Sequence, residues 1–134
     1  MQIYLLRHGN AAGVPAKQNV VIDAIFSSPH IRVQQTAAIM NQTFNVKEYI
    51  MTEYLIPGSE HSQLIDTLNG QSFHTILLVG HEPHLSSFIS SLVSGARGSN
   101  IVMGKGSLAC VESSDLVQAG SGLLRLLLPT ECMM

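Results

Sequence analysis

Two kinds of hydrophobic pattern alternate along the chain. Short runs that are apolar throughout, such as Ile3 to Leu6 and Thr75 to Val79, are typical of strands buried on both faces of a parallel sheet. In Arg32 to Met40 and Ser59 to Leu68, apolar residues recur every three or four positions, which predicts amphipathic helices. Strands that alternate with helices predict an α/β fold with a mostly parallel central sheet.

The remaining segments extend this pattern. Val20 to Phe26 and Val46 to Met51 predict two further strands, and Leu85 to Val93 predicts a third helix. Near the C-terminus, Ser107 to Val111 and Leu123 to Leu128 predict two strands that pair as a hairpin. We therefore expect a three-layer α/β/α sandwich.

The composition is that of one folded domain over residues 1–134. Hydrophobic residues make up 46% of the chain and charged residues 12%, unlike a disordered chain. The net charge of −2, with only seven Lys and Arg, argues against binding along a nucleic-acid duplex. No apolar run approaches the roughly 20 residues of a membrane span, and no secretory signal is visible at the N-terminus. Cys110 and Cys132 match neither a metal-ligand spacing nor a disulfide framework, so we expect a cytoplasmic protein.

Side chains suited to phosphate chemistry follow three of the predicted strands. Arg7 and His8 come directly after the first strand. Arg32 begins the helix after the second strand, and His81 follows the most apolar one. Because the carboxyl ends of parallel strands meet at one edge of a sheet, we expect one shared cleft. Arginine matches phosphate oxygens, a histidine can accept a phosphoryl group, and Gly9 would let the backbone turn so that both Arg7 and His8 reach the site.

These residues are distributed among three segments of the chain: Leu6-Arg7-His8-Gly9, Ser27 to Ala37 and Val79-Gly80-His81-Glu82-Pro83. In this order and at these distances they resemble the signatures of the histidine phosphatase (phosphoglycerate mutase-like) superfamily. The small size and the His-Glu-Pro-His form of the third segment resemble the short SixA-type branch, the phosphohistidine phosphatases. The resemblance covers nearly the whole chain.

The resemblance implies roles for the candidate residues. His8 would be the nucleophile and form a phosphohistidine intermediate, and Gly9 would belong to the phosphate-binding turn. Arg7, Arg32 and His81 would bind phosphoryl oxygens and stabilise the transition state. His81 would act best as an imidazolium, a state that nearby phosphate favours by raising its pKa. No metal ion or organic cofactor is implied, and the substrate would be a phosphohistidine-bearing phosphotransfer protein in signalling.

Two other functions stay open at this stage. One is a phosphomonoesterase of the same superfamily acting on a phosphorylated small molecule. Such an enzyme uses a carboxyl group as general acid because an alkoxide is a poor leaving group, and Glu53, Glu60 and Glu82 are the candidates. A phosphohistidine loses an imidazole, whose conjugate acid has a pKa of about 6.5, and needs such an acid far less. The other is a catalytically weak phosphohistidine-binding regulatory module.

One departure from the family pattern lies between the first two strands. Relatives carry an amphipathic helix of several turns there, whereas only Asn10 to Ile22 joins the two strands here. The expected fold therefore lacks that helix, and one face of the sheet would lose part of its cover. We expect either a homodimer that buries the exposed apolar surface or weakened activity.

The other histidines have simpler interpretations. His30, His61 and His74 are expected to be structural or to lie on the rim of the site, and His84 is the best of the four for contact with substrate. A metal site at His81 and His84 is disfavoured, because the proline between them disrupts the helical spacing of zinc ligands. Gly104-Lys105-Gly106 differs from a phosphate-binding P-loop in its spacing and is expected to be a flexible loop.

Overall fold

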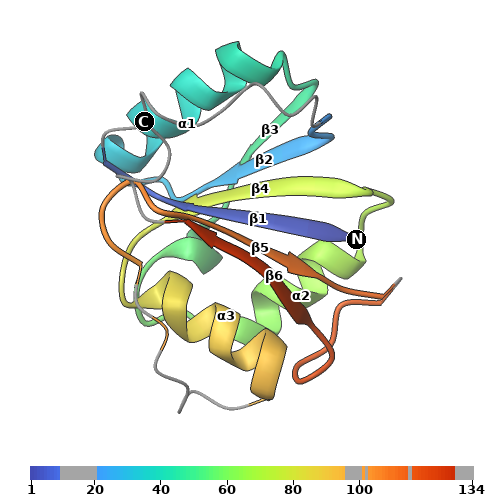
Figure 1. Cartoon of the computed structure of the whole chain (residues 1–134). Coiled ribbons are helices and arrows are strands. Elements are labelled where there is room, and N and C mark those ends of the chain that lie inside the picture. The colour runs from blue at the N-terminus through green and yellow to red at the C-terminus, as the bar shows by residue number, and fades with distance from the viewer. Residues whose placement is uncertain (10–20, 96–100, 102, 115, 129–134) are drawn as a thin grey trace.

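The computed structural model describes residues 1–9, 21–95, 101, 103–114 and 116–128 (Figure 1). The strands within these ranges are β1 (Gln2–Arg7), β2 (Ala24–Ser27), β3 (Glu48–Met51), β4 (Thr75–Gly80), β5 (Leu108–Glu112) and β6 (Leu123–Leu128). The helices are α1 (Ile31–Phe44), α2 (His61–Asn69) and α3 (His84–Ser94), with a 3-10 turn, η2, at Glu53–Leu55.

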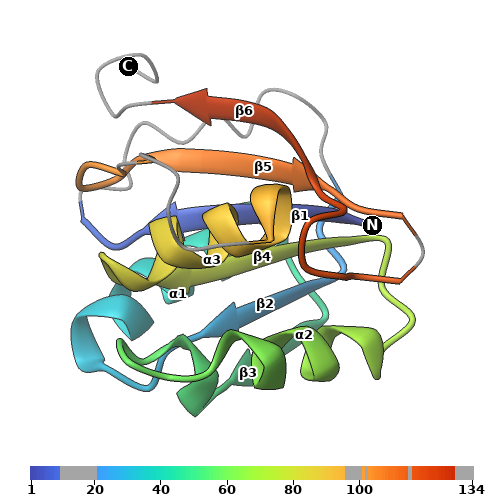
Figure 2. The same ribbon diagram turned by 90° about the horizontal axis from the view of Figure 1, so that it is seen from below.

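The strands form a six-stranded sheet in the order β3-β2-β4-β1-β5-β6. The first four of these run parallel, β5 is antiparallel to β1, and β6 is antiparallel to β5 (Figure 2). In the register, Arg7 lies opposite Gly80 and Ser27 lies opposite Val79. The segments that follow β1, β2 and β4 therefore begin at the same level, at one edge of the sheet.

Helices cover both faces of this sheet, with α1 on one face and α2 and α3 on the other (Figure 1). Val33 and Met40 of α1 pack with Leu77 of β4, and all three are almost fully buried. The three-layer α/β/α sandwich with a mostly parallel sheet is therefore confirmed. The core on the second face includes Phe26, Leu64, Leu78, Leu85 and Phe88.

The elements differ from the sequence prediction mainly at their ends. β2 begins at Ala24, and of the predicted strand Val20 to Phe26 the first residue lies outside the described ranges. The Asp23 carboxylate, just before β2, accepts hydrogen bonds from the backbone N–H groups of His74 (2.8 Å) and Thr75 (2.9 Å). Asp23 thus serves the start of β4 and does not continue a strand. Helix α1 extends beyond Met40 to Phe44, where Asn45 ends it in the left-handed conformation.

Two predictions concern residues outside the described ranges. The absence of a helix between the first two strands rests on Asn10 to Ile22, of which only the last two residues are described. Cys132 also lies outside, whereas Cys110 is buried as a free thiol. In the described part of the chain, no helix is long and apolar enough to cross a membrane.

Candidate active site

Backbone pairing brings the strand ends together. The N–H of His8 donates to the carbonyl of Gly80 (3.1 Å), and the N–H of Ser28 donates to the carbonyl of Val79 (3.2 Å). The rings of His8 and His81 consequently lie edge to face, with their centroids 5.5 Å apart. The segments after β1, β2 and β4 therefore form one site.

The side chain of Arg7 is held by the backbone of a residue before β5. Its Nη1 donates to the backbone carbonyl of Met103 at 2.8 Å. Among the described residues, Nε of Arg7 is buried and has no hydrogen-bond partner. Buried donors almost always have an acceptor, and a phosphoryl oxygen is an acceptor of the right charge. The guanidinium of Arg7 is therefore suited to hold an anion.

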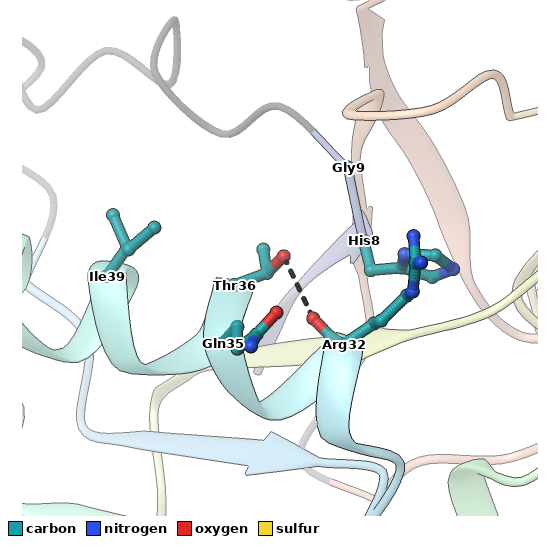
Figure 3. A pocket seen from close by; sticks show the side chains of 6 residues that line it. All are labelled: His8, Gly9, Arg32, Gln35, Thr36 and Ile39. Carbon is teal, nitrogen blue, oxygen red and sulfur yellow. Dashed lines mark hydrogen bonds between the residues drawn. The ribbon is translucent and has the colours of Figure 1, made fainter.

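Arg32 lies in the first turn of α1, exposed to solvent, and its side chain extends toward the ring of His8 (Figure 3). The hydroxyl of Thr36 donates to the backbone carbonyl of Arg32, one helical turn earlier, at 3.4 Å. A hollow of about 280 Å³ opens between β1 and α1 at this point. It is lined by His8, Gly9, Arg32, Gln35, Thr36 and Ile39.

Gly9 allows a second loop to approach the segment that carries His8. Its φ is +154°, and a Cβ added there would lie 2.9 Å from the backbone nitrogen of Gly106. The N–H of Gly106 donates to the carbonyl of Arg7 (3.2 Å), and the N–H of Arg7 donates to the carbonyl of Ser107 (3.1 Å). We expected Gly104-Lys105-Gly106 to be only a flexible loop, but it pairs with the backbone of Arg7 and adds the charge of Lys105 near His8.

Ser28 and His30 also belong to this site. The Oγ of Ser28 lies 3.0 Å from Nε2 of His81 and accepts the backbone N–H of His30 at 3.2 Å. The ring of His30 lies edge to face with that of His81, with centroids 5.1 Å apart. We expected His30 to be structural or to lie on the rim of the site, and Ser28 entered the prediction only as part of the segment Ser27 to Ala37. Their position at the carboxyl end of β2 was the signal that could have identified both.

Positive charges surround His8. Burial lowers the pKa of the His8 ring below its ordinary value of 6.5, and the neighbouring side chains of Arg7, His30, Arg32 and Lys105 lower it further. His8 is therefore neutral at physiological pH. A neutral imidazole has the free electron pair that a nucleophile requires.

His81 is shifted in the same direction. Burial lowers its pKa below 6.5, and the neighbouring rings of His30, His8 and His84 add to this effect. The expectation of an imidazolium at His81 therefore does not describe the free site, in which the ring is neutral. A bound dianion would have to supply the opposite shift.

The candidate carboxylates are engaged elsewhere or exposed. Oε1 of Glu82 accepts the N–H of Ser86 at 2.9 Å, and its Oε2 accepts the hydroxyl of the same serine, so that Glu82 caps the start of α3. Glu53 and Glu60 are exposed. Across the described ranges, no carboxylate forms an ion pair or hydrogen bond with the arginines or histidines of the site. The described site therefore contains arginines and imidazoles but no carboxylate.

The other histidines are engaged elsewhere or exposed. His84 is buried and its Nε2 donates to the carbonyl of Tyr54 at 2.9 Å, so the prediction that it contacts substrate is corrected. His61 is buried beside Ser87, 2.8 Å from its hydroxyl, and His74 is exposed next to the first residue of β4. The described residues contain no group of three or more His, Cys, Asp or Glu that could hold a metal ion.

No protein-family model and no curated protein matches the chain. Solved structures do match it. The protein histidine phosphatase SixA, solved in complex with tungstate, is 20% identical over 97% of each chain, with a TM-score of 0.81. A phosphoglycerate mutase from Plasmodium falciparum is 22% identical over 93% of this chain and 88% of its own, with a TM-score of 0.71. An alpha-ribazole phosphatase from Shigella flexneri is 15% identical over 97% of each chain, with a TM-score of 0.72.

Proposed function

We propose that this chain, whose fold is that of the histidine phosphatase superfamily, removes the phosphoryl group from phosphohistidine on a phosphotransfer protein. The observation that carries the proposal is the neutral ring of His8 facing His81 in a site where the nearby charges are positive. A nucleophile and a binding site for phosphoryl oxygens are then present in one place.

The proposed reaction has two displacements at phosphorus. A ring nitrogen of His8 forms a bond to phosphorus while the nitrogen–phosphorus bond of the substrate breaks, and its electron pair leaves with the substrate imidazole, which takes a proton. Water then attacks phosphorus, its proton passes to solvent, and the electron pair returns to His8. Arg7, Arg32 and His81 stabilise the charge on the phosphoryl oxygens throughout.

Two features favour a phosphohistidine protein as the substrate. An imidazole leaves readily without a dedicated acid, and the described site offers no carboxylate. Exposed apolar side chains also flank the site: Ile31 is 64% exposed at the start of α1, and Ile39 is 51% exposed at the other end of the hollow that His8 lines (Figure 3). Apolar groups around a polar centre suit contact with a protein surface better than contact with a small polar metabolite.

The test compares phosphate release from a phosphohistidine-bearing phosphotransfer domain and from a generic phosphate ester. We expect release from the domain that disappears in His8→Ala, because the nucleophile has no substitute. His74→Ala is the matched control, since His74 is exposed near the opposite end of β4. Circular dichroism of both variants checks that they fold.

Each alternative has its own outcome in this test. A preference for the ester, together with an essential carboxylate, would favour the small-metabolite phosphomonoesterase. Phosphate binding without release from either substrate would favour the phosphohistidine-binding module. Unchanged release in His8→Ala would overturn the covalent mechanism.

A further inference from the structure

Three imidazoles, rather than two, line the strand ends. The ring of His81 lies 5.5 Å from that of His8 and 5.1 Å from that of His30, centroid to centroid. Ser28 connects the middle ring to one of the outer two, because its Oγ lies 3.0 Å from Nε2 of His81 and accepts the backbone N–H of His30 at 3.2 Å. The placement of His30 is therefore tied to the placement of His81.

His30 also faces a hollow separate from the one beside Arg32. This second hollow has a volume of about 450 Å³ and lies beyond His81. Its walls are mostly apolar, and His30 and His81 are its titratable groups. It is lined by Pro29, His30, Ile56, Pro57 and His81. A group leaving a phosphorus atom bound beside His81 can enter this hollow and meet the ring of His30.

The site needs a proton donor if it is to release anything more basic than an imidazole. The described residues place no carboxylate in it, and Glu82 is occupied as the cap of α3. Imidazole is the side chain that both gives and takes protons near neutral pH. An exposed histidine at the edge of the site can exchange that proton with solvent between turnovers.

We propose that His30 is the proton donor to the leaving group, and that it extends the substrate range of this site from phosphohistidine to phosphate esters. This inference rests on the proposed phosphatase function. In the first displacement the His8 nitrogen bonds to phosphorus and the phosphorus–oxygen bond of the ester breaks. The electron pair stays on the leaving oxygen, which takes the proton of the His30 imidazolium.

The second displacement restores both histidines. The oxygen of water bonds to phosphorus, a proton of that water passes to neutral His30, and the electron pair of the phosphorus–nitrogen bond returns to His8. The net reaction is ester plus water giving alcohol plus phosphate, with no further reactant.

The experiment compares wild type, His30→Gln and the control His74→Gln on three probes. These are phosphoimidazole, p-nitrophenyl phosphate and glycerol phosphate, in order of increasingly poor leaving groups. We expect His30→Gln to lose about 100-fold in kcat on glycerol phosphate and only a few-fold on the other two, because an acid matters most for the poorest leaving group. The alkaline limb of the kcat profile on glycerol phosphate should disappear in this variant.

Chemical rescue adds a readout that a structural role would not move. In His30→Ala, free imidazole in the buffer should restore turnover of glycerol phosphate, since the exposed position leaves room for it. His74→Ala should not respond to imidazole.

The outcomes separate the two proposals. An equal loss on all three probes, or no loss on glycerol phosphate, would overturn the role of His30 and leave the phosphatase function intact. No release by wild type from any probe would overturn both.

Discussion

At the scale of single residues, Gly9 shows how one missing side chain shapes the site. A Cβ at this position would lie 2.9 Å from the backbone nitrogen of Gly106 and 3.1 Å from Cβ of Lys105. The first contact is shorter than packed atoms tolerate and the second is tight, so the second loop would have to shift. The carbonyl of Arg7 would then lose the N–H of Gly106, and the segment carrying His8 would shift.

We predict that Gly9→Ala lowers kcat/KM for phosphate release about 100-fold, because a displacement near 1 Å at a nucleophile has effects of that size. Gly58→Ala is the control, since Gly58 also has a positive φ, +90°, but has no atom within 4 Å of an added Cβ. It should lower the free energy of unfolding without lowering kcat/KM. Unchanged turnover in Gly9→Ala would show that the second loop does not position His8.

At the scale of elements, the start of α3 is joined to the loop that holds Arg7. Oε2 of Glu82 accepts the N–H of Met103 at 3.4 Å, and the carbonyl of the same methionine accepts Nη1 of Arg7 at 2.8 Å. The carboxylate that caps α3 therefore also supports the arginine indirectly. Its role is structural, in contrast to the general-acid role left open for it by the sequence.

We predict that Glu82→Ala lowers the free energy of unfolding by about 1 kcal/mol, the usual cost of a lost helix cap. It should also weaken phosphate binding several-fold, because Met103 would lose the carboxylate and hold Arg7 less firmly. The dependence of kcat on the leaving group should match that of wild type, which distinguishes a cap from an acid. Glu112→Ala, which removes an exposed ion pair with Arg125, serves as the control for lost charge. A steeper leaving-group dependence in Glu82→Ala would contradict this assignment.

At the scale of the whole molecule, local and net charge have opposite signs. The chain has a formal net charge of −2, yet three of its seven Lys and Arg residues, Arg7, Arg32 and Lys105, act on His8. Burial and these cations keep the ring of His8 less basic than in an unfolded chain, and burial and the neighbouring histidines do the same for the ring of His81. The positive charges of the site favour a bound anion. An anion would in turn raise the pKa values of these histidines, so anion binding and proton binding are thermodynamically linked.

We predict that the free energy of unfolding of the free protein falls as pH drops below 6.5, the ordinary histidine pKa. In that window the unfolded chain binds protons that folded His8 and His81 do not, so acid favours unfolding, until pH falls below the folded pKa values. Urea titrations between pH 7 and about 5.5 test this. Tungstate should reduce the slope by raising both pKa values, and His8→Ala should reduce it by removing one group. A slope that is the same in wild type and His8→Ala would contradict the assignment.

Much of the fold could be predicted because the signals were local. β4 was predicted from the apolar run Thr75 to Val79, and α1 from the periodic pattern after Arg32. The spacing of buried side chains follows directly from the geometry of a strand or a helix. The start of β2 could not be predicted, because Asp23 is drawn to the backbone of His74 and Thr75, which are distant in sequence.

The sequence by itself determined which residues stand at the carboxyl ends of β1, β2 and β4, and hence that Arg7, His8 and His81 meet at one edge of a parallel sheet. Only the tertiary structure decided how Ser28 and His30 join them, because these contacts depend on side-chain directions across separate elements. It also decided the sense of the histidine pKa shifts. Burial is the largest cause of both shifts, and apart from Arg7 and His84 the side chains that add to them come from other segments of the chain, so no local pattern encodes them.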